Sequence, residues 1–327
     1  MLNELNDKLL LVVENIEVTK QAEKLFSQQI ENWSLAVKGY SSLSSVEVKK
    51  YEYDNFFIEA HFNPGRIVSS SAKVDVKSIS ERPCFLCIKN LPAEQKAIKL
   101  IEDYILLVNP FPIFNKHFTI PTIQHTPQQI KTEVVNMLLI ASLLGKDYSI
   151  FYNGPKCGAS APDHMHFQAG NFGFMKIDTD FENLVKNNSK VVYESKEVKT
   201  SFFTGCLRSF IAIEADNIDE IDNEFSKIYS LLCESGVEEP LMNIICTFNK
   251  SWRLLIFPRS KHRPTYFFEE GEKKVLISPA AVDMGGVLIF PREEDFAKIT
   301  RELIEDVFSQ VSFSSERMKM LESKMMK

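Results

Sequence analysis

Histidines are concentrated in one part of this 327-residue sequence. The chain has six of them, and four fall within a stretch of 50 residues: His117, His125, His164 and His166. Near neutral pH, imidazole can serve as a general base, a metal ligand or a nucleophile. The clustering therefore predicts one chemical site in the first half of the chain.

The sharpest pattern is His-Met-His-Phe-Gln at residues 164–168. Alternate residues of a strand share a face and lie about 7 Å apart. The histidines and the glutamine are therefore predicted to face one way and the two apolar residues to face the core. Two imidazoles and an amide are costly to bury without partners. The roles of metal ligand, general base and nucleophile all stay open for these histidines. If one is a nucleophile, a phosphorus electrophile suits it, and Gln168 and Ser160 could bond phosphate oxygens.

This run, preceded by Gly-Ala-Ser at residues 158–160, resembles the transferase branch of the histidine-triad (HIT) superfamily. That branch includes galactose-1-phosphate uridylyltransferase, ADP-glucose phosphorylase, diadenosine tetraphosphate phosphorylase and GDP-L-galactose phosphorylase. Segments 63–66, 82–87 and 279–291 resemble one bacterial family within it. The resemblance implies that His166 attacks the α-phosphorus of a nucleotide and forms a nucleotidyl-His166 intermediate, in a two-step, ping-pong reaction with retention at phosphorus.

The same resemblance implies roles for the residues around His166. Gln168 would hold the α-phosphate, and Ser160 would lie near the departing phosphate. The backbone would approach the nucleotide at Asn153 and Gly154, which stand where the branch has an upstream Asn-x-Gly stretch, and Gly158 is a further candidate for binding substrate.

A metal site is suggested by Cys84 and Cys87, which are spaced as Cys-x-x-Cys. A tetrahedral zinc site needs a second pair of ligands, and His125 and His164 are the natural candidates. Resemblance to the zinc-containing uridylyltransferases implies these four ligands and a structural zinc ion with no open position. Two buried thiols and two hydrogen-bonded histidines are the alternative.

Phosphates need local positive charge, because the chain carries a net charge of −6. This charge argues against nucleic acid or anionic membrane as a partner. The candidate substrate-binding cations are Arg66, Lys73, Arg259, Lys261 and Arg263. A solvated basic loop is the alternative for the last three. His117 is a candidate ribose or phosphate contact, or else a buried histidine with its hydrogen bonds satisfied.

Composition describes a folded, soluble chain with 44% hydrophobic and 25% charged residues. No apolar run approaches the roughly 20 residues needed to span a bilayer, and residues 1–14 are predicted to form an amphipathic first helix. Six cysteines with only one close pair do not indicate a disulfide framework. A cytoplasmic location is expected.

The element order in the second half repeats that in the first. The first set is predicted as strands 56–62, 104–108 and 117–120, a helix from Thr126 to about Gly145, and strands 148–152 and 164–169. The second is predicted as strand 202–213, helix 218–233, and strands 242–247 and 252–257. Pro258 followed by His262 echoes Pro121 followed by His125, and residues 278–286 take the place of the catalytic strand without its histidines. The alternative is two unrelated domains whose strands happen to be followed by proline and histidine in a similar way.

The predicted architecture is α+β, with two HIT-like repeats of antiparallel sheet and helices packed on one face. Residues 1–177 form the catalytic repeat, 178–200 a linker and 201–327 a repeat without His-x-His. The predicted function is a nucleotidyltransferase or phosphorylase for a nucleoside diphosphate sugar or dinucleoside polyphosphate, with phosphate or a sugar phosphate as acceptor. The alternatives are a nucleotide hydrolase using the same histidine and a non-catalytic nucleotide-binding regulatory protein. A second copy of the chain, in a homodimer, is a further candidate partner.

Overall fold

The computed structural model describes residues 17–67, 76–101, 103–233 and 237–326. Lys73 and the helix predicted for residues 1–14 lie outside the described residues.

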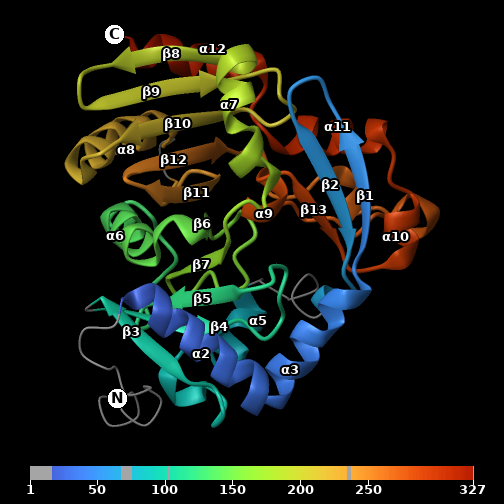
Figure 1. The fold of residues 1–327 in the computed structure, drawn as a ribbon. Coiled ribbons are helices and arrows are strands. Elements are labelled where there is room, and N and C mark those ends of the chain that lie inside the picture. The colour runs from blue at the N-terminus through green and yellow to red at the C-terminus, as the bar shows by residue number, and fades with distance from the viewer. Residues whose placement is uncertain (1–16, 68–75, 102, 234–236, 327) are drawn as a thin grey trace.

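One ten-stranded antiparallel sheet runs through the molecule, from β8 at the top of Figure 1 to β3 at the bottom. Its strands, in spatial order, are β3 (Ala97–Ile101), β4 (Tyr104–Val108), β5 (His117–Pro121), β7 (His166–Asn171), β6 (Tyr148–Asn153), β11 (Met242–Asn249), β12 (Ser251–Pro258), β10 (Phe210–Ala215), β9 (Val198–Phe203) and β8 (Ser189–Glu194). The central strands carry nearly continuous apolar runs, such as Tyr104–Val108, because their side chains are buried on both faces of the sheet.

The sheet is built from two copies of one topology. Three strands, a helix and two strands follow one another in each half, with helix α6 (Val134–Leu144) in the first and α8 (Ile218–Leu232) in the second. The halves meet where β6 pairs antiparallel with β11. The predicted α+β class of two repeats is confirmed, and their sheets join edge to edge into one.

Both faces of the sheet are covered. Helices α6, α8, α2 (Val18–Asn32) and α12 (Ser315–Met325) pack on one face, over a core that includes Met165 and Phe167. The other face carries a small sheet of β1 (Glu47–Glu52), β2 (Phe57–Phe62) and β13 (Val287–Phe290), with α7 (Lys176–Asn188), α9 (Ala281–Met284), α10 (Glu293–Ala297) and α11 (Arg301–Val311). Helices α3 (Ser34–Ser41) and α5 (Val76–Glu81) complete the described helices. The expectation of helices on one face therefore misses this second layer.

The segment 178–200, expected to be a linker, is folded. It contains most of α7, all of β8 and the start of β9. Its polar composition reflects exposed faces, because α7 buries only a narrow stripe that includes Ile177, Phe181 and Leu184. The predicted strand 202–213 is also two strands, separated by a turn in which Gly205 and Leu207 have positive φ.

The predicted helix from Thr126 begins only at Val134. Residues before it are held out of the helix by side-chain bonds. The amide N–H of Ile130 donates to Glu239 at 2.7 Å, and the Gln128 side chain bonds the backbone of β7.

The counterpart of the catalytic strand in the second repeat is β12, because β7 and β12 occupy the same place in the two topologies. This corrects both the pairing of Pro258 with Pro121 and the placement of residues 278–286, which form a loop and α9. On the face where β7 carries His166 and Gln168, β12 carries Leu255 and Phe257, both in the core.

A buried polar network crosses the junction of the two repeats. Asn153 and Asn243 are cross-strand partners, and the amide nitrogen of Asn243 donates to the Asn153 side chain at 2.9 Å and to the carbonyl of Cys157 at 2.8 Å. The Asn243 side-chain oxygen accepts from the guanidinium of Arg259, and the Asn153 oxygen accepts from the Ala281 amide at 2.8 Å. Each repeat therefore holds loops of the other.

Asn243→Ala is expected to destabilise the protein by about 3 kcal/mol, because it removes one hydrogen bond from each of three buried groups: the Arg259 guanidinium, the Asn153 side-chain oxygen and the Cys157 carbonyl. Urea unfolding measures this change. Asn249→Ala, at the exposed end of the same strand, is the control and should change the free energy of unfolding by less than about 0.5 kcal/mol. Similar losses in both variants would contradict a stabilising network at the junction.

Candidate active site and metal centre

A cavity of about 490 Å³ lies between the two repeats. The first repeat contributes His166, Gln168, Asn153, Gly158 and Ser160 to its lining, and the second contributes His262, Arg263, Ser278 and Asp283. Apolar side chains, among them Phe111, Leu107, Phe85 and Phe267, line the rest. A concave, largely apolar site with a few converging polar groups is typical of small-molecule binding.

His166 is buried on β7, and a backbone carbonyl determines which ring nitrogen carries its proton. Ring atom Nδ1 lies 2.8 Å from the carbonyl oxygen of His164, which can only accept, so Nδ1 carries the proton. Nε2 is then left with its lone pair. Burial lowers the pKa of His166 to about 4, so the ring is neutral at pH 7.

Gln128 holds the backbone around His166. Its side-chain oxygen accepts from the His166 amide at 2.8 Å, and its nitrogen donates to the carbonyls of His166 at 3.0 Å and Asn153 at 2.9 Å. The register of β6 with β7 ends at Phe151 and Gln168, so Gln128 replaces the missing pairing. No motif in the sequence indicated this residue.

The loop that precedes β7 brings Ser160 and its neighbouring glycine to the cavity. Gly158 has a φ of +100°, and a Cβ there would lie 2.6 Å from the Cβ of Ala280. A Cβ on Gly154 would lie 2.9 Å from the carbonyl of Met242. Close approach of the second repeat therefore requires glycine at both positions.

Two residues beyond His166 along β7 lies Gln168, which lines the cavity and accepts a hydrogen bond from His117 at 3.0 Å. His117 is fully buried and is not among the residues that line the cavity. The expectation that His117 contacts ribose or phosphate is thus corrected: Gln168 stands between it and the cavity.

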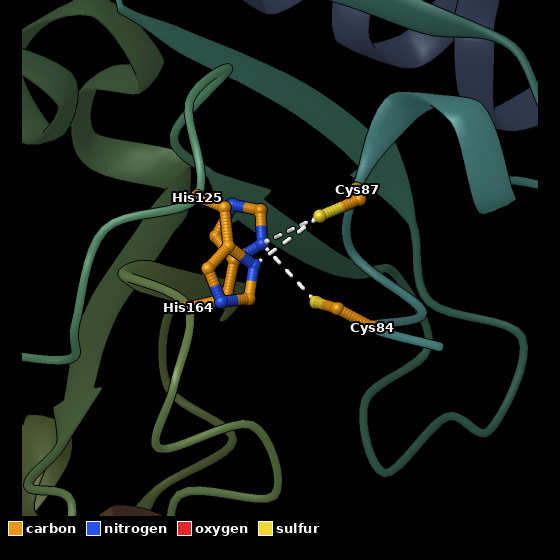
Figure 2. A group of neighbouring side chains, drawn as sticks. All are labelled: Cys84, Cys87, His125 and His164. Atoms are coloured by element: carbon orange, nitrogen blue, oxygen red, sulfur yellow. Dashed lines mark hydrogen bonds between the residues drawn. The ribbon is translucent and has the colours of Figure 1, made fainter. Parts of the chain in front are cut away.

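The four predicted metal ligands come together. One ligand atom from each of Cys84, Cys87, His125 and His164 lies within 4.8 Å of all the others, and Figure 2 shows the two rings facing the two sulfurs. Three sulfur to Nδ1 distances are 3.2, 3.2 and 3.7 Å. A tetrahedron with normal Zn–S and Zn–N bonds has edges of roughly 3.5 Å. The donor set and spacing therefore fit a metal ion such as zinc.

The second ring nitrogen of each histidine has a partner of its own. Nε2 of His164 donates to the carbonyl of Thr122 at 2.9 Å, and Nε2 of His125 lies 3.6 Å from a carboxylate oxygen of Asp163. The hydrogen bond to Thr122 leaves Nδ1 of His164 unprotonated and aimed at the cluster, as in protein zinc sites.

Basic residues divide into two groups. Arg66 and Arg263 line the cavity. Arg259 does not: it is buried and donates to Asn243 and to four backbone carbonyls, those of Val311, Pro279, Lys261 and His262. Lys261 also lies outside the lining and donates to Gln310 at 3.0 Å. The expectation of substrate contacts for Arg259 and Lys261 is corrected, because protein acceptors already engage both cations.

Several cavity residues were not predicted as site residues from the sequence. His262 and Ser278 are 3.3 Å apart, and Arg263 donates to Ser278 at 3.0 Å while its guanidinium lies 3.9 Å from the ring centre of Phe267. Arg82 lines the cavity and donates to the Ser160 carbonyl at 2.8 Å. His262, Ser278 and Arg82 come from segments far apart in the chain, so spacing could not bring them into one site, whereas Arg263 is one of the cations predicted from the sequence.

Comparisons with known proteins agree with this architecture. Residues 25–171 match the family model "Domain of unknown function (DUF4922)", and residues 185–327 match the model "GDPGP1-like, C-terminal domain". The crystal structure of yeast Ap4A phosphorylase Apa2 is similar at a TM-score of 0.56 and 16% identity, covering 93% of this chain and 96% of that one. Its complex with Ap4A gives a TM-score of 0.58 at 16% identity, covering 93% and 99%. None of the curated proteins matches the chain.

This likeness shows the fold. Residues 185–327 match the GDPGP1-like C-terminal domain model, and the chain shares the fold of yeast Ap4A phosphorylase Apa2. The predicted resemblance to the transferase branch of the HIT superfamily is confirmed at that level. In the described part of the chain, no helix has the length and apolarity needed to cross a membrane.

Removing the metal ligand Cys87 is expected to remove bound metal. Protein purified without added metal should contain one zinc ion per chain by elemental analysis, and Cys87→Ser should contain almost none. The variant should also melt roughly 8 °C lower, because binding at a thousandfold excess over Kd contributes about 4 kcal/mol and each kcal/mol is about 2 °C in a chain of this size.

Cys233→Ser is the matched control, since Cys233 is exposed and lies outside the cluster. It should keep the wild-type zinc content and melting temperature. A wild-type protein free of zinc and of other metals would contradict the metal centre and favour the alternative of thiols bonded to histidines.

Proposed function

We propose that this chain, with its GDPGP1-like C-terminal domain and Ap4A phosphorylase fold, is a nucleotidyltransferase of the phosphorylase type. Its donor is a nucleoside diphosphate sugar or a dinucleoside polyphosphate, and its acceptor is phosphate or a sugar phosphate. Apa2 is described in complex with AMP and with Ap4A, which supports nucleotides as substrates here. The reaction proceeds through a nucleotide bound covalently to His166.

The tautomer of His166 carries this proposal. Its Nδ1–H is held by the carbonyl of His164, so the lone pair of Nε2 is available on a residue that lines the cavity. A neutral imidazole needs no general base before it attacks phosphorus. The Nδ1–H bond to a carbonyl also stabilises the positive charge that the ring gains when Nε2 forms a bond.

The electrons balance over two displacements. Nε2 of His166 forms a bond to the α-phosphorus, and the bond from that phosphorus to the bridging oxygen breaks, with its electron pair leaving on the departing phosphate. In the second step an acceptor oxygen bonds to the phosphorus and the P–N bond breaks, returning the pair to Nε2. Two inversions give retention. Gln168 donates to the α-phosphate oxygens, and Ser160 lies near the departing phosphate.

Two arginines supply the positive charge that phosphates need. Neither Arg66 nor Arg263 lies within 4 Å of a carboxylate oxygen among the described residues. Burial lowers the pKa of Arg66 to about 10 and also lowers that of Arg263. Asp283 acts on Arg66 only at longer range, and a desolvated guanidinium with no carboxylate in direct contact is stabilised by an anionic ligand. The cavity therefore suits a polyanion even though the protein is acidic overall.

Zinc, when bound to the four ligands, has no open coordination position and acts as a structural cross-link. It would hold His164, whose backbone carbonyl is the acceptor that orients His166. Cys84, Cys87 and His125 thereby support the nucleophile without contacting the substrate.

Covalent labelling tests the intermediate. After incubation with candidate nucleotide sugars and dinucleoside polyphosphates, intact mass spectrometry should show wild-type protein heavier by one nucleotidyl group. His166→Ala should show no adduct and lose at least about 10⁴-fold in turnover, because the nucleophile is removed. His61→Gln, outside the cavity, should still be labelled.

Adduct formation on His166→Ala would refute the assignment of the nucleophile. Labelled protein that is discharged by water at the same rate with and without phosphate would indicate the hydrolase instead. Nucleotide binding with no adduct on wild-type protein would indicate the non-catalytic alternative.

Arg263→Gln is expected to raise the KM for the phosphate-bearing substrates about tenfold, because a charged hydrogen bond contributes about 1.5 kcal/mol or more. Lys261→Gln removes the same charge two residues away and outside the cavity, so its KM should stay within about twofold of wild type. Steady-state kinetics at varied substrate measure both. Equal effects of the two substitutions would point to general electrostatics and not to a phosphate contact.

A further inference from the structure

Behind Gln168, on the neighbouring strand β5, lies a histidine that the proposed mechanism leaves without a role. His117 is 0% exposed. Its strand pairs with β7 so that Thr119 is opposite Gln168 and His117 is opposite Gly170. The first question is what holds a buried imidazole at this position.

The backbone of His117 is clamped at both of its polar groups. Its amide donates to the hydroxyl of Tyr40 at 3.2 Å, and its carbonyl accepts from that hydroxyl at 3.0 Å and from the Asn109 amide at 2.8 Å. Tyr40 comes from helix α3, far from β5 in the sequence. The position of the histidine is therefore set by tertiary contacts.

The ring of His117 is held between aromatic side chains. Phe114 meets it at a centroid distance of 5.2 Å and Phe151 at 6.0 Å. Phe114 occupies the space where residue 170 would carry a side chain, since a Cβ on Gly170 would lie 2.2 Å from that ring. The glycine opposite His117 thus makes room for the residue that fixes its ring.

Hydrogen bonds determine which ring nitrogen of His117 carries the proton. The backbone N–H of Ile113 donates to Nδ1 at 3.2 Å, so Nδ1 is unprotonated. Burial and the nearby charge of Arg66 lower the pKa of His117 to about 3, so the ring is neutral. Its one proton is therefore on Nε2, 3.0 Å from the side-chain oxygen of Gln168.

This bond fixes the orientation of the Gln168 amide. The oxygen accepts from Nε2–H of His117, so the –NH₂ group is the end of Gln168 that can donate into the cavity. The opposite orientation would present a carbonyl oxygen to phosphate oxygens, which repel it. A protein N–H donor aimed at developing negative charge is worth about 10² to 10³ in rate.

We propose that His117 is a positioning residue that turns the Gln168 amide so that its –NH₂ group donates to the phosphoryl group during transfer. This proposal rests on the proposed function, because it assumes that a phosphoryl group is transferred next to Gln168. The chain of contacts runs from the Ile113 amide through the His117 ring to Gln168, and from there into the cavity.

A double-mutant cycle tests the positioning role. His117→Leu removes the donor and should slow adduct formation on His166 roughly 100-fold, as should Gln168→Leu, with the donor KM within about threefold of wild type. The double variant should be no slower than Gln168→Leu alone, because one donor is lost in each case. His117→Gln offers an amide near the position of Nε2 and should recover at least tenfold of the loss.

Wild-type rates in His117→Leu, or losses that multiply in the double variant, would overturn the proposal. If His117→Leu fails to fold, His117→Gln and His117→Asn are compared instead. The Asn amide is too short to reach Gln168, so the proposal expects faster adduct formation in His117→Gln. Equal rates in those two variants would overturn it.

The tautomer can be measured without any substrate. Six histidines give a tractable NMR spectrum in protein labelled with ¹⁵N-histidine, and His117→Gln identifies the signals of His117. The expected result is a neutral ring protonated at Nε2. A proton on Nδ1 would overturn the proposal whatever the activity, whereas an Nε2–H ring in a wild-type protein that forms no adduct would count against the proposed function.

Discussion

The pairing of β6 with β11 is the contact on which the rest of this molecule depends. It converts two five-stranded sheets into one, and it places the loops of the second repeat over the catalytic face of the first. At its end, Asn153 and Asn243 are buried opposite each other and have satisfied polar atoms only because each repeat supplies partners to the other. The polar network makes the register specific, since a shift by one residue would break the hydrogen bonds that join Asn153, Asn243 and Arg259.

Backbone carbonyls set the tautomer and orientation of His164 and of His166, the proposed nucleophile. The Thr122 carbonyl orients His164 towards the cysteine pair, and the His164 carbonyl orients His166 towards the cavity. Alternate residues of one short segment thus belong to two neighbouring sites: His164 to the candidate metal centre and His166 to the proposed reaction centre. Because both rings are neutral and singly protonated, each presents one lone pair in one direction. Zinc bound to the four residues would be a structural cross-link close to His166 and would limit the movement of the His164 carbonyl that orients its ring.

The two repeats have diverged in chemistry while keeping their topology. The face of β7 that carries His166 and Gln168 corresponds to a face of β12 that carries Leu255 and Phe257 in the core. The second repeat contributes instead through the loops beyond β12, which bring Arg263, His262 and Ser278 to the cavity. A buried Arg259 supports these loops through their carbonyls. One repeat therefore holds His166, the proposed nucleophile, and the other supplies Arg263 and lines the opposite side of the cavity.

The sequence by itself determined that His166 and Gln168 share one face of a strand, because this depends on local spacing. The four residues of the candidate metal cluster followed from the Cys-x-x-Cys pair together with the resemblance to the zinc-containing uridylyltransferases. The sequence also predicted two repeats from the order of their elements. The sequence could not distinguish cations with a structural role from those that line the cavity. Nothing in the run at residues 259–263 shows that Arg259 donates to backbone carbonyls while Arg263 reaches the cavity. It also misread residues 178–200, where exposed polar faces conceal a helix and strands, and it could not reveal Gln128 or the role of His117. Those outcomes follow from long-range hydrogen bonds and burial, which exist only once distant strands have paired.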